Sequence, residues 1–246
     1  MSSFAVILPA AGKSRRFQDK NYKKQFAPLA GRAVWLHSAE RFMNRNDVTQ
    51  VVLVLAADDR EAFHLKFAAN VAILGIDLVE GGAERADSIE RALAKVSDDA
   101  EFIAVHDAAR PCLADQWIDQ VFSAAQRTGA AILATPVANT LKRSSDGKHF
   151  SETVDRRGLW EAQTPQVFRR QLLLDAYAKR NGYAATDDAE LVERIGQQVT
   201  LVTGSPLNRK VTSRDDLKLA EQILKILPKP TGTGFEHPFA DDDLWK

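Results

Sequence analysis

A short segment near the start of the chain combines small residues with cations. Ala10, Ala11 and Gly12 follow a short apolar run, and Arg16 and Lys24 come a few residues later. Small side chains let the backbone approach a phosphate or a base closely, and the exposed amides can donate hydrogen bonds to anionic oxygens. Amides beside two cations suit a nucleoside triphosphate. The segment is therefore a candidate nucleotide-binding loop.

Two common phosphate-binding loops fit this segment poorly. The dinucleotide-binding turn needs G-x-G-x-x-G and an acidic residue about 20 positions later. Here there is one glycine, and Asp58 lies much too far along the chain. The P-loop needs an upstream glycine, whereas Gly12, Lys13 and Ser14 supply only its ending. Neither of these two sites is expected.

Three further polar clusters each follow a predicted strand. Gly82 ends one strand and leads to Ser88, whose hydroxyl could read the edge of a base. Asp107 and Arg110 follow a second strand, where the carboxylate could hold Mg²⁺ through water and the guanidinium could bind phosphate. An ion pair that only staples the loop is the alternative interpretation of these two residues. Lys210 follows a third strand and precedes the last helix.

Strands and helices alternate along most of the chain. Uninterrupted apolar runs are typical of strands buried on both faces, and apolar residues at helical spacing follow them. The alternation predicts an α/β fold, with a mostly parallel sheet and helices on both faces. Right-handed crossovers then place the polar clusters along one edge of the sheet. The last two helices begin with capping-box spacing, Asp187 to Glu190 and Ser213 to Asp216. We expect strands in Phe4–Pro9, Val51–Ala57, Ala72–Val79, Phe102–His106, Ala130–Pro136 and Val199–Thr203, and helices over Val34–Met43, Arg60–Ala69, Ala86–Val96, Asp115–Thr128, Arg170–Lys179, Asp187–Gly196 and Ser213–Leu227.

The stretch from about residue 138 to residue 160 interrupts this alternation. It is polar and has no long apolar run, although Leu141 and Val154 could anchor two short strands around Asp146 and Gly147. A solvated surface loop is one interpretation. A loop of this length inside a compact domain is unusual unless it is functional. The alternative is an excursion that docks on something else.

Composition and charge narrow the class of protein. The 246 residues include 33 basic and 33 acidic side chains, and zero net charge argues against bulk binding to nucleic acid or an anionic membrane. Cys112 is the only cysteine, so the chain has no intrachain disulfide. Apolar runs are far shorter than the roughly 18 residues of a membrane span, and the first residues lack the charged region of a signal peptide. We therefore expect a cytoplasmic enzyme that does not bind membranes, with a poorly packed C-terminal extension at 228–246.

The chain closely resembles the 2-C-methyl-D-erythritol 4-phosphate cytidylyltransferases of the non-mevalonate isoprenoid pathway. The resemblance runs from Phe4 to about Leu227 and implies a nucleotidyltransferase domain, 1–227, with a Rossmann-like fold. It also implies Mg²⁺-dependent transfer of CMP from CTP to 2-C-methyl-D-erythritol 4-phosphate, which gives 4-CDP-2-C-methyl-D-erythritol and pyrophosphate. The family's homodimer implies that segment 138–160 is a protruding dimerisation arm. The shared motifs are AAGKSRRF, KQFAPLAG, GGAERADSI, VHDAARPCL, NTLKR, TVDRRGLWEAQTPQVF, TDDAELVE and NRKVT.

The resemblance implies a role for each matching position. Arg16 and Lys24 match the cations that stabilise the transition state at the α-phosphate. Arg156 and Lys210 match the residues that position the attacking phosphate, and the arm would supply Arg156 and Thr140 to the neighbouring subunit. The remaining matches fall into two groups: Ala10, Ala11, Gly12, Gly82 and Ser88 around the nucleotide, and Asp107, Arg110, Thr140 and Thr164 around the acceptor and the metal.

Three positions depart from the family's pattern. The family usually has a second glycine where Ser14 stands, so this loop has less freedom at φ > 0. It often has proline at Lys23, which makes this loop more basic, and an aspartate where Asn139 stands. None of these changes touches a residue assigned to the α-phosphate.

The implied chemistry needs no general base, because a phosphate oxygen of the acceptor is already an anion at neutral pH. Catalysis then consists of alignment and of charge neutralisation by Mg²⁺, arginine and lysine. His106 is accordingly expected to be a structural neighbour of Asp107. Two alternatives stay open: a ribitol 5-phosphate cytidylyltransferase, which shares much of the motif set, and a non-catalytic nucleotide-binding module.

Overall fold

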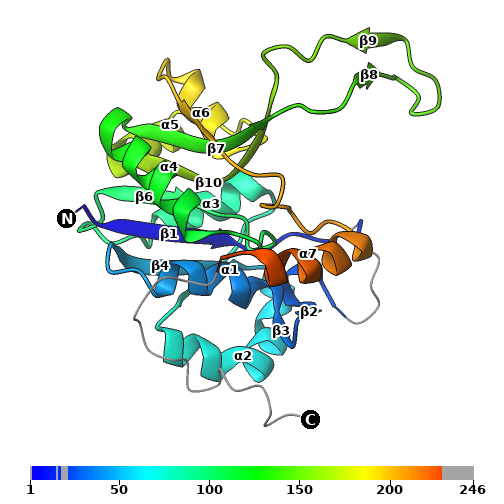
Figure 1. Ribbon diagram of the computed structural model, residues 1–246. Helices are drawn as coiled ribbons and strands as arrows, with labels where there is room; N and C mark the ends of the chain where they lie inside the picture. Colours follow the sequence, from blue (N-terminus) through cyan, green and yellow to red (C-terminus); the bar gives the residue numbers. More distant parts are fainter. Residues whose placement is uncertain (1, 15, 18–21, 229–246) are drawn as a thin grey trace.

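A seven-stranded sheet forms the centre of the computed structural model, which describes residues 2–14, 16–17 and 22–228 (Figure 1). The strand order is β11-β7-β10-β6-β1-β4-β5, and every neighbouring pair is parallel except the two that involve β10. The predicted mostly parallel sheet is therefore confirmed. Its strands are β1 (Phe4–Pro9), β4 (Val48–Leu55), β5 (Asp77–Glu80), β6 (Phe102–Val105), β7 (Ala130–Pro136), β10 (Trp160–Arg169) and β11 (Thr200–Thr203).

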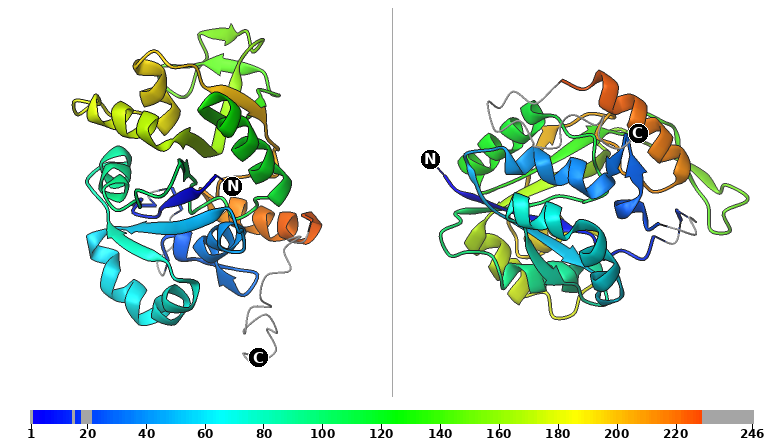
Figure 2. Two further views of the ribbon diagram at one scale, coloured as in Figure 1. Left: turned by 90° about the vertical axis from the view of Figure 1, so that its left-hand side faces the viewer. Right: turned by 90° about the horizontal axis from the view of Figure 1, so that it is seen from below.

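Helices cover both faces of the sheet (Figure 2). Alternate residues of β1 show why: Phe4 and Val6 pack into one hydrophobic cluster, whereas Ala5 and Ile7 pack into the other. The first cluster contains buried residues of α1, α2, α4 and α7, and the second contains those of α3, α5 and α6. The helices are α1 (Val34–Met43), α2 (Arg60–Leu74), α3 (Arg85–Leu93), α4 (Asp115–Thr128), α5 (Arg170–Ala178), α6 (Asp188–Arg194) and α7 (Arg214–Ile226).

Short elements complete the chain. A small antiparallel pair, β2 (Pro28–Leu29) and β3 (Arg32–Ala33), precedes α1, and the 3₁₀ turns are η1 (Lys24–Phe26) and η2 (Ala57–Asp59). Within the described ranges, no helix is long and apolar enough to cross a membrane. Residues 229–246 of the predicted extension lie outside the part of the chain that the structure describes.

Strand β10 was not predicted, because polar residues interrupt it. Gln163, Thr164 and Gln166 are nevertheless buried. Each has hydrogen-bond partners that offset the cost of burial: Gln166 Oε1 accepts from the backbone of Asp188, and Thr164 Oγ1 accepts from the Asp107 amide. The strand runs antiparallel between β6 and β7.

The predicted excursion is a two-stranded arm that projects away from the sheet (Figure 1). It contains β8 (Leu141–Arg143) and β9 (Glu152–Val154), and Leu141 lies opposite Val154 as expected. The tip is closed by Asp146, whose carboxylate accepts hydrogen bonds from the amides of Lys148 and His149, each at 2.8 Å. The arm is therefore an ordered hairpin.

Candidate active site

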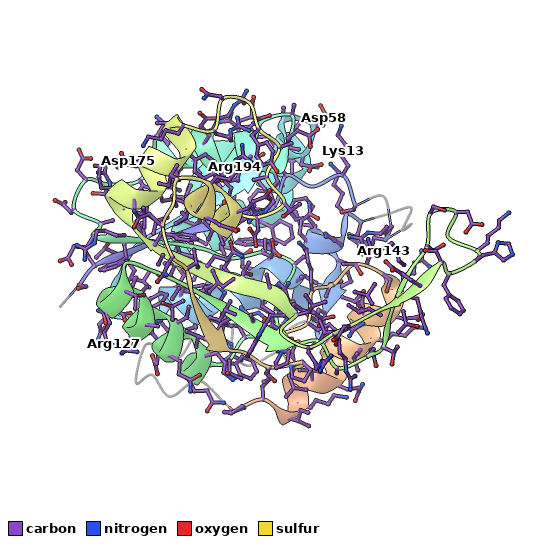
Figure 3. The ribbon with its side chains drawn as sticks, turned by 90° about the horizontal axis from the view of Figure 1, so that it is seen from above. Lys13, Asp58, Arg127, Arg143, Asp175 and Arg194 are labelled. Carbon is purple, nitrogen blue, oxygen red and sulfur yellow. The ribbon has the colours of Figure 1, made fainter. Side chains whose placement is uncertain are left out.

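A cavity of about 430 Å³ opens at the carboxyl edge of the sheet. It lies between the loops that follow β1, β5 and β6, and the segment before α7 also reaches it. Lys13 and Asp58 both line it, and Figure 3 shows these two side chains on the same side of the molecule. Eight of the predicted site residues line this cavity: Ala10, Ala11, Gly12, Lys24, Gly82, Ser88, Asp107 and Lys210.

The loop after β1 is held by the side chain of Gln25, which is buried. Its amide nitrogen donates to the carbonyl oxygen of Ala10 at 2.5 Å, and its amide oxygen accepts from Ser14 Oγ at 3.1 Å. The same hydroxyl accepts from the backbone N–H of Lys24 at 3.2 Å. Ser14 has φ of +51°, the left-handed conformation that favours glycine. Its side-chain hydrogen bonds offset part of that strain.

The second loop is packed so tightly that it needs its two glycines. A Cβ atom on Gly81 would lie 2.7 Å from Ala11 Cβ and 2.8 Å from Ser88 Oγ. A Cβ atom on Gly82 would lie 2.4 Å from Asp87 Cβ. Ser88 Oγ accepts from the Gly82 amide at 3.1 Å and donates to the Glu84 carbonyl at 3.0 Å. The first two loops therefore pack closely against each other, and residues of both line the cavity.

Asp107 is the central anion of the cavity. Its Oδ2 atom lies 2.8 Å from Lys210 Nζ and 3.3 Å from Arg110 Nε. Burial alone would raise the pKa of Asp107, but Lys210, Arg85 and Arg110 outweigh it and hold the pKa well below its usual range. The carboxylate is therefore charged. Arg110 Nη1 also donates to the Asn208 carbonyl at 2.7 Å, so the predicted Asp–Arg pair does join two loops.

Lys24 is surrounded by other cations. Burial, and then the nearby charge of Lys210, lower the pKa of Lys24 to about 8, with Arg16 and Arg110 adding to the effect. Arg16 is exposed and does not line the cavity, although its charge acts on Lys24. Cations thus outnumber the nearby carboxylate, which suits the cavity to a polyanion.

Two residues lie behind Asp107. Thr164 is buried and contacts the Asp107 amide and His106 Nδ1 through its hydroxyl, at 3.0 and 3.2 Å. His106 Nε2 lies 3.1 Å from the Arg110 carbonyl, and burial lowers the pKa of His106 to about 4, so the ring is neutral. The structure does not bring Thr164 to the cavity wall; it supports the loop that carries Asp107.

Thr140 precedes β8 and Arg156 follows β9, and neither residue lines the cavity of its own chain. Both side chains are exposed. The structure thus separates two predicted site residues from the others.

Five further charged side chains line the cavity beyond those predicted. Lys23 forms an ion pair with Asp59 at 2.7 Å, and Arg85 forms one with Asp188 at 2.7 Å. The sequence offered a local indication of both residues, because Lys23 adjoins Lys24 and Arg85 follows the Gly81-Gly82 turn. The additional charged residues are Lys13, Lys23, Asp58, Glu84 and Arg85.

The donor set fits a magnesium ion that is held largely by its substrate. In the described part of the chain, no three His, Cys, Asp or Glu side chains are grouped as a metal site. Asp107 is a charged carboxylate at the cavity wall. Mg²⁺ is commonly bound by one or two carboxylates, substrate phosphates and water, and Asp107 can serve in that way.

An open α/β sheet with small-residue loops and clustered cations at its carboxyl edge defines a nucleotide-binding protein suited to nucleotidyl transfer. The sequence model of the 2-C-methyl-D-erythritol 4-phosphate cytidylyltransferase family matches residues 4–226. The chain belongs to this family and is therefore a cytidylyltransferase, one of the nucleotidyltransferases.

Relatives and solved structures agree with this assignment. A 2-C-methyl-D-erythritol 4-phosphate cytidylyltransferase from Rhodopirellula baltica is 45% identical over 235 residues, which cover 91% of this chain and 95% of that protein. One from Bacillus velezensis is 42% identical over 226 residues, covering 90% and 96%. The crystal structure of the enzyme from Thermus thermophilus has a TM-score of 0.74 at 33% identity, and covers 92% of this chain and 100% of that one. A crystal structure of 4-diphosphocytidyl-2C-methyl-D-erythritol synthase has a TM-score of 0.77 at 32% identity, covering 91% and 99%.

Proposed function

We propose that this chain transfers the CMP group of CTP to 2-C-methyl-D-erythritol 4-phosphate and releases pyrophosphate, a step of isoprenoid precursor synthesis. The family match over residues 4–226 supports this reaction. The observation that carries it is the convergence of Ala11, Gly82 and Ser88 with Lys24 and Lys210 on one cavity. Small residues suited to a base and cations suited to phosphates thus line the same cavity.

The reaction needs alignment and charge compensation. A phosphate oxygen of the acceptor attacks the α-phosphorus of CTP; one P–O bond forms, and the bond to the leaving pyrophosphate breaks. No proton has to move, because the attacking oxygen is already an anion. We assign Lys24 and Arg16 to the developing charge at the α-phosphate, where one preorganised donor typically contributes about 10² to 10³ in rate.

Lys210 and Asp107 would act on the other reactant. Their 2.8 Å ion pair fixes the ammonium group at the cavity wall, and we assign Lys210 to the acceptor phosphate. When bound, Mg²⁺ would neutralise phosphate charge and orient the groups. Asp107, together with phosphate oxygens, would hold it.

We also propose that the protein is a cytoplasmic homodimer whose sites are completed by the arm. Three large apolar side chains of the arm region, Phe150, Leu159 and Trp160, are 64%, 40% and 40% exposed in the single chain. A partner subunit would cover these side chains of the arm. A two-fold dimer would give two equivalent contacts, and Arg156 and Thr140 would reach the partner's cavity.

The two candidate cytidylyltransferase activities differ in the acceptor, which is either methylerythritol phosphate or ribitol 5-phosphate. The names of the relatives favour methylerythritol phosphate over ribitol 5-phosphate. Pyrophosphate release should be measured with CTP and each acceptor, and with ATP or GTP replacing CTP. We expect efficient release only with CTP and methylerythritol phosphate, because tightly packed loops of small residues suit a pyrimidine. Preference for ribitol 5-phosphate, or equal turnover with ATP, would refute the assignment, and no release with any pair would favour a binding module.

A further inference from the structure

A completely buried carboxylate lies next to the cavity, and the proposed reaction does not use it. Asp188 is the first residue of α6 and is 0% exposed. Its Oδ2 atom lies 2.7 Å from Arg85 Nη2, and its Oδ1 atom accepts from the Tyr177 hydroxyl at 2.6 Å. Its backbone N–H donates to Gln166 Oε1 at 3.1 Å. Residues of α3, α5 and β10 therefore meet at this one residue of α6.

Arg85 is the member of this network that reaches the cavity. It lines the cavity together with Lys24, Asp107 and Lys210, and its side chain is 28% exposed. A guanidinium carries five N–H donors in a rigid planar fork. Among the described residues, the hydrogen bond of the Arg85 side chain is the one that Nη2 donates to Asp188. Further donors of the fork are thus available to an oxygen in the cavity.

The network is better explained by positioning than by stability alone. Burying an ion pair costs desolvation energy, and well-packed apolar residues often stabilise a fold as well or better. A bidentate or planar recognition group, in contrast, gains from being fixed in one orientation. The Tyr177 hydroxyl fixes the carboxylate, and the carboxylate fixes the guanidinium.

We propose that Arg85 binds a phosphate oxygen of a substrate and that Asp188 is its positioning residue. This inference rests on the proposed function and adds two residues to it. The shared ligand chemistry is an anionic phosphate oxygen, which either the CTP triphosphate or the acceptor phosphate can provide. Separate measurements with the two substrates identify the source.

The test compares Arg85→Gln, Asp188→Asn and the double variant by steady-state kinetics and by calorimetric binding of CTP and of the acceptor. Hydrogen bonds to charged groups are strong, so we expect Arg85→Gln to weaken one substrate by about tenfold to a hundredfold, with kcat changed less. Asp188→Asn should weaken the same substrate. The double variant should be no weaker than Arg85→Gln, because both changes remove one interaction.

Thermal stability supplies an independent readout. Arg85→Gln leaves a buried carboxylate without its cation, so its Tm should fall. Adding Asp188→Asn should raise that Tm again without restoring substrate affinity. A purely structural pair would leave the affinity of folded protein unchanged in every variant, and that result would overturn the proposal.

Two more variants keep the test decisive. Arg85→Lys retains the charge but loses the fork, so it should fold well and still bind the substrate more weakly. Arg45→Gln is the matched control: Arg45 is also mostly buried and pairs with Asp47 and Asp119 at 2.7 Å, but it does not line the cavity. It should lower Tm without changing affinity. Because calorimetry requires no turnover, wild-type CTP binding without transferase activity would refute the proposed function while leaving the test of Arg85 intact.

Discussion

Lys24 combines burial with close cationic neighbours, and both lower its pKa to about 8. Bound triphosphate would raise the pKa of Lys24 again, because it places negative charge beside the ammonium group. The lysine is thus charged below pH 8 in the free protein, and it must take up a proton to bind CTP well above that pH. This residue couples nucleotide binding to pH.

We therefore predict that kcat/KM for CTP falls as pH rises through about 8, as measured with saturating acceptor. Lys24→Arg should abolish this alkaline decrease even if its rate is lower, because arginine stays protonated. A wild-type profile that stays flat to pH 10 would show that Lys24 does not carry the dependence.

Gly81 lies where the loop after β5 packs against the loop after β1. Its added Cβ would lie within 3 Å of both Ala11 and Ser88, so Gly81→Ala must separate the two loops. We predict a stability loss of about 1 to 3 kcal/mol and a raised KM for CTP. Gly12→Ala is the control for stability, because nothing lies within 4 Å of its added Cβ. Equal Tm values for wild type and Gly81→Ala would contradict the packing account.

The site residues that neighbour a recognisable turn in the sequence could be predicted. Lys24 and Asp107 stand beside recognisable turns, so their positions followed from the strand order. Arg85 also follows a turn, but its pairing with Asp188, which is 103 positions later in the chain, could not be predicted locally. Ion pairs between distant segments leave no periodic pattern.

At the scale of elements, apolar patterns predicted β1, β7, α1 and α4 with their observed bounds. Strand β10 was missed because its buried polar side chains are stabilised by hydrogen bonds from other segments. Of the two predicted capping boxes, the one formed by Ser213 and Asp216 is complete. At α6, Asp187 caps the Glu190 amide, but the Glu190 side chain accepts from Thr186 instead.

The complete capping box also organises the segment that carries Lys210. The Asp216 carboxylate accepts from the amides of Thr212 and Ser213, each at 3.0 Å, and from Arg209 Nε at 3.0 Å. Although burial raises the pKa of Asp216, hydrogen bonds from Thr212, Arg209 and Ser213 hold it below its usual value. Its stabilising effect is therefore present above the unfolded pKa near 4 and is lost as pH falls below it.

We predict that Asp216→Ala raises the KM for the acceptor severalfold, because the Lys210 segment loses its anchor. Ser213→Ala removes the cap alone and should cost about 1 kcal/mol of stability with a smaller change in KM. Chemical denaturation and acceptor titrations distinguish the two effects. An unchanged acceptor KM in Asp216→Ala would show that Asp216 does not position Lys210.

At the scale of the whole molecule, the arm is the feature that a single chain leaves unexplained. It projects from the sheet (Figure 1). Arg156, which follows β9, is exposed and does not line the cavity that Lys24 lines. Its hairpin could be predicted from Leu141 and Val154, but its direction could not, because no local pattern records where a hairpin points. A dimer with shared sites would account for it.

Mixed dimers test this arrangement. Lys24→Ala and Arg156→Ala homodimers should each be nearly inactive, since every site lacks one cation. A heterodimer has one site that lacks both residues and one site that is intact. Refolding an equal mixture should therefore restore about a quarter of wild-type activity, because half of the randomly paired dimers are mixed. If the mixture stays inactive while wild type refolds well, Arg156 acts within its own subunit.

Isotopic labelling tests most directly whether this cavity directs an acceptor phosphate to the α-phosphorus of CTP. CTP labelled in its α-phosphate should be incubated with methylerythritol phosphate and either wild-type protein or Lys24→Ala. We expect wild type to transfer the label into 4-CDP-2-C-methyl-D-erythritol and to release one unlabelled pyrophosphate per product. Lys24→Ala should form this product about a hundredfold more slowly. Label in the released pyrophosphate, or an undiminished rate in Lys24→Ala, would contradict this mechanism.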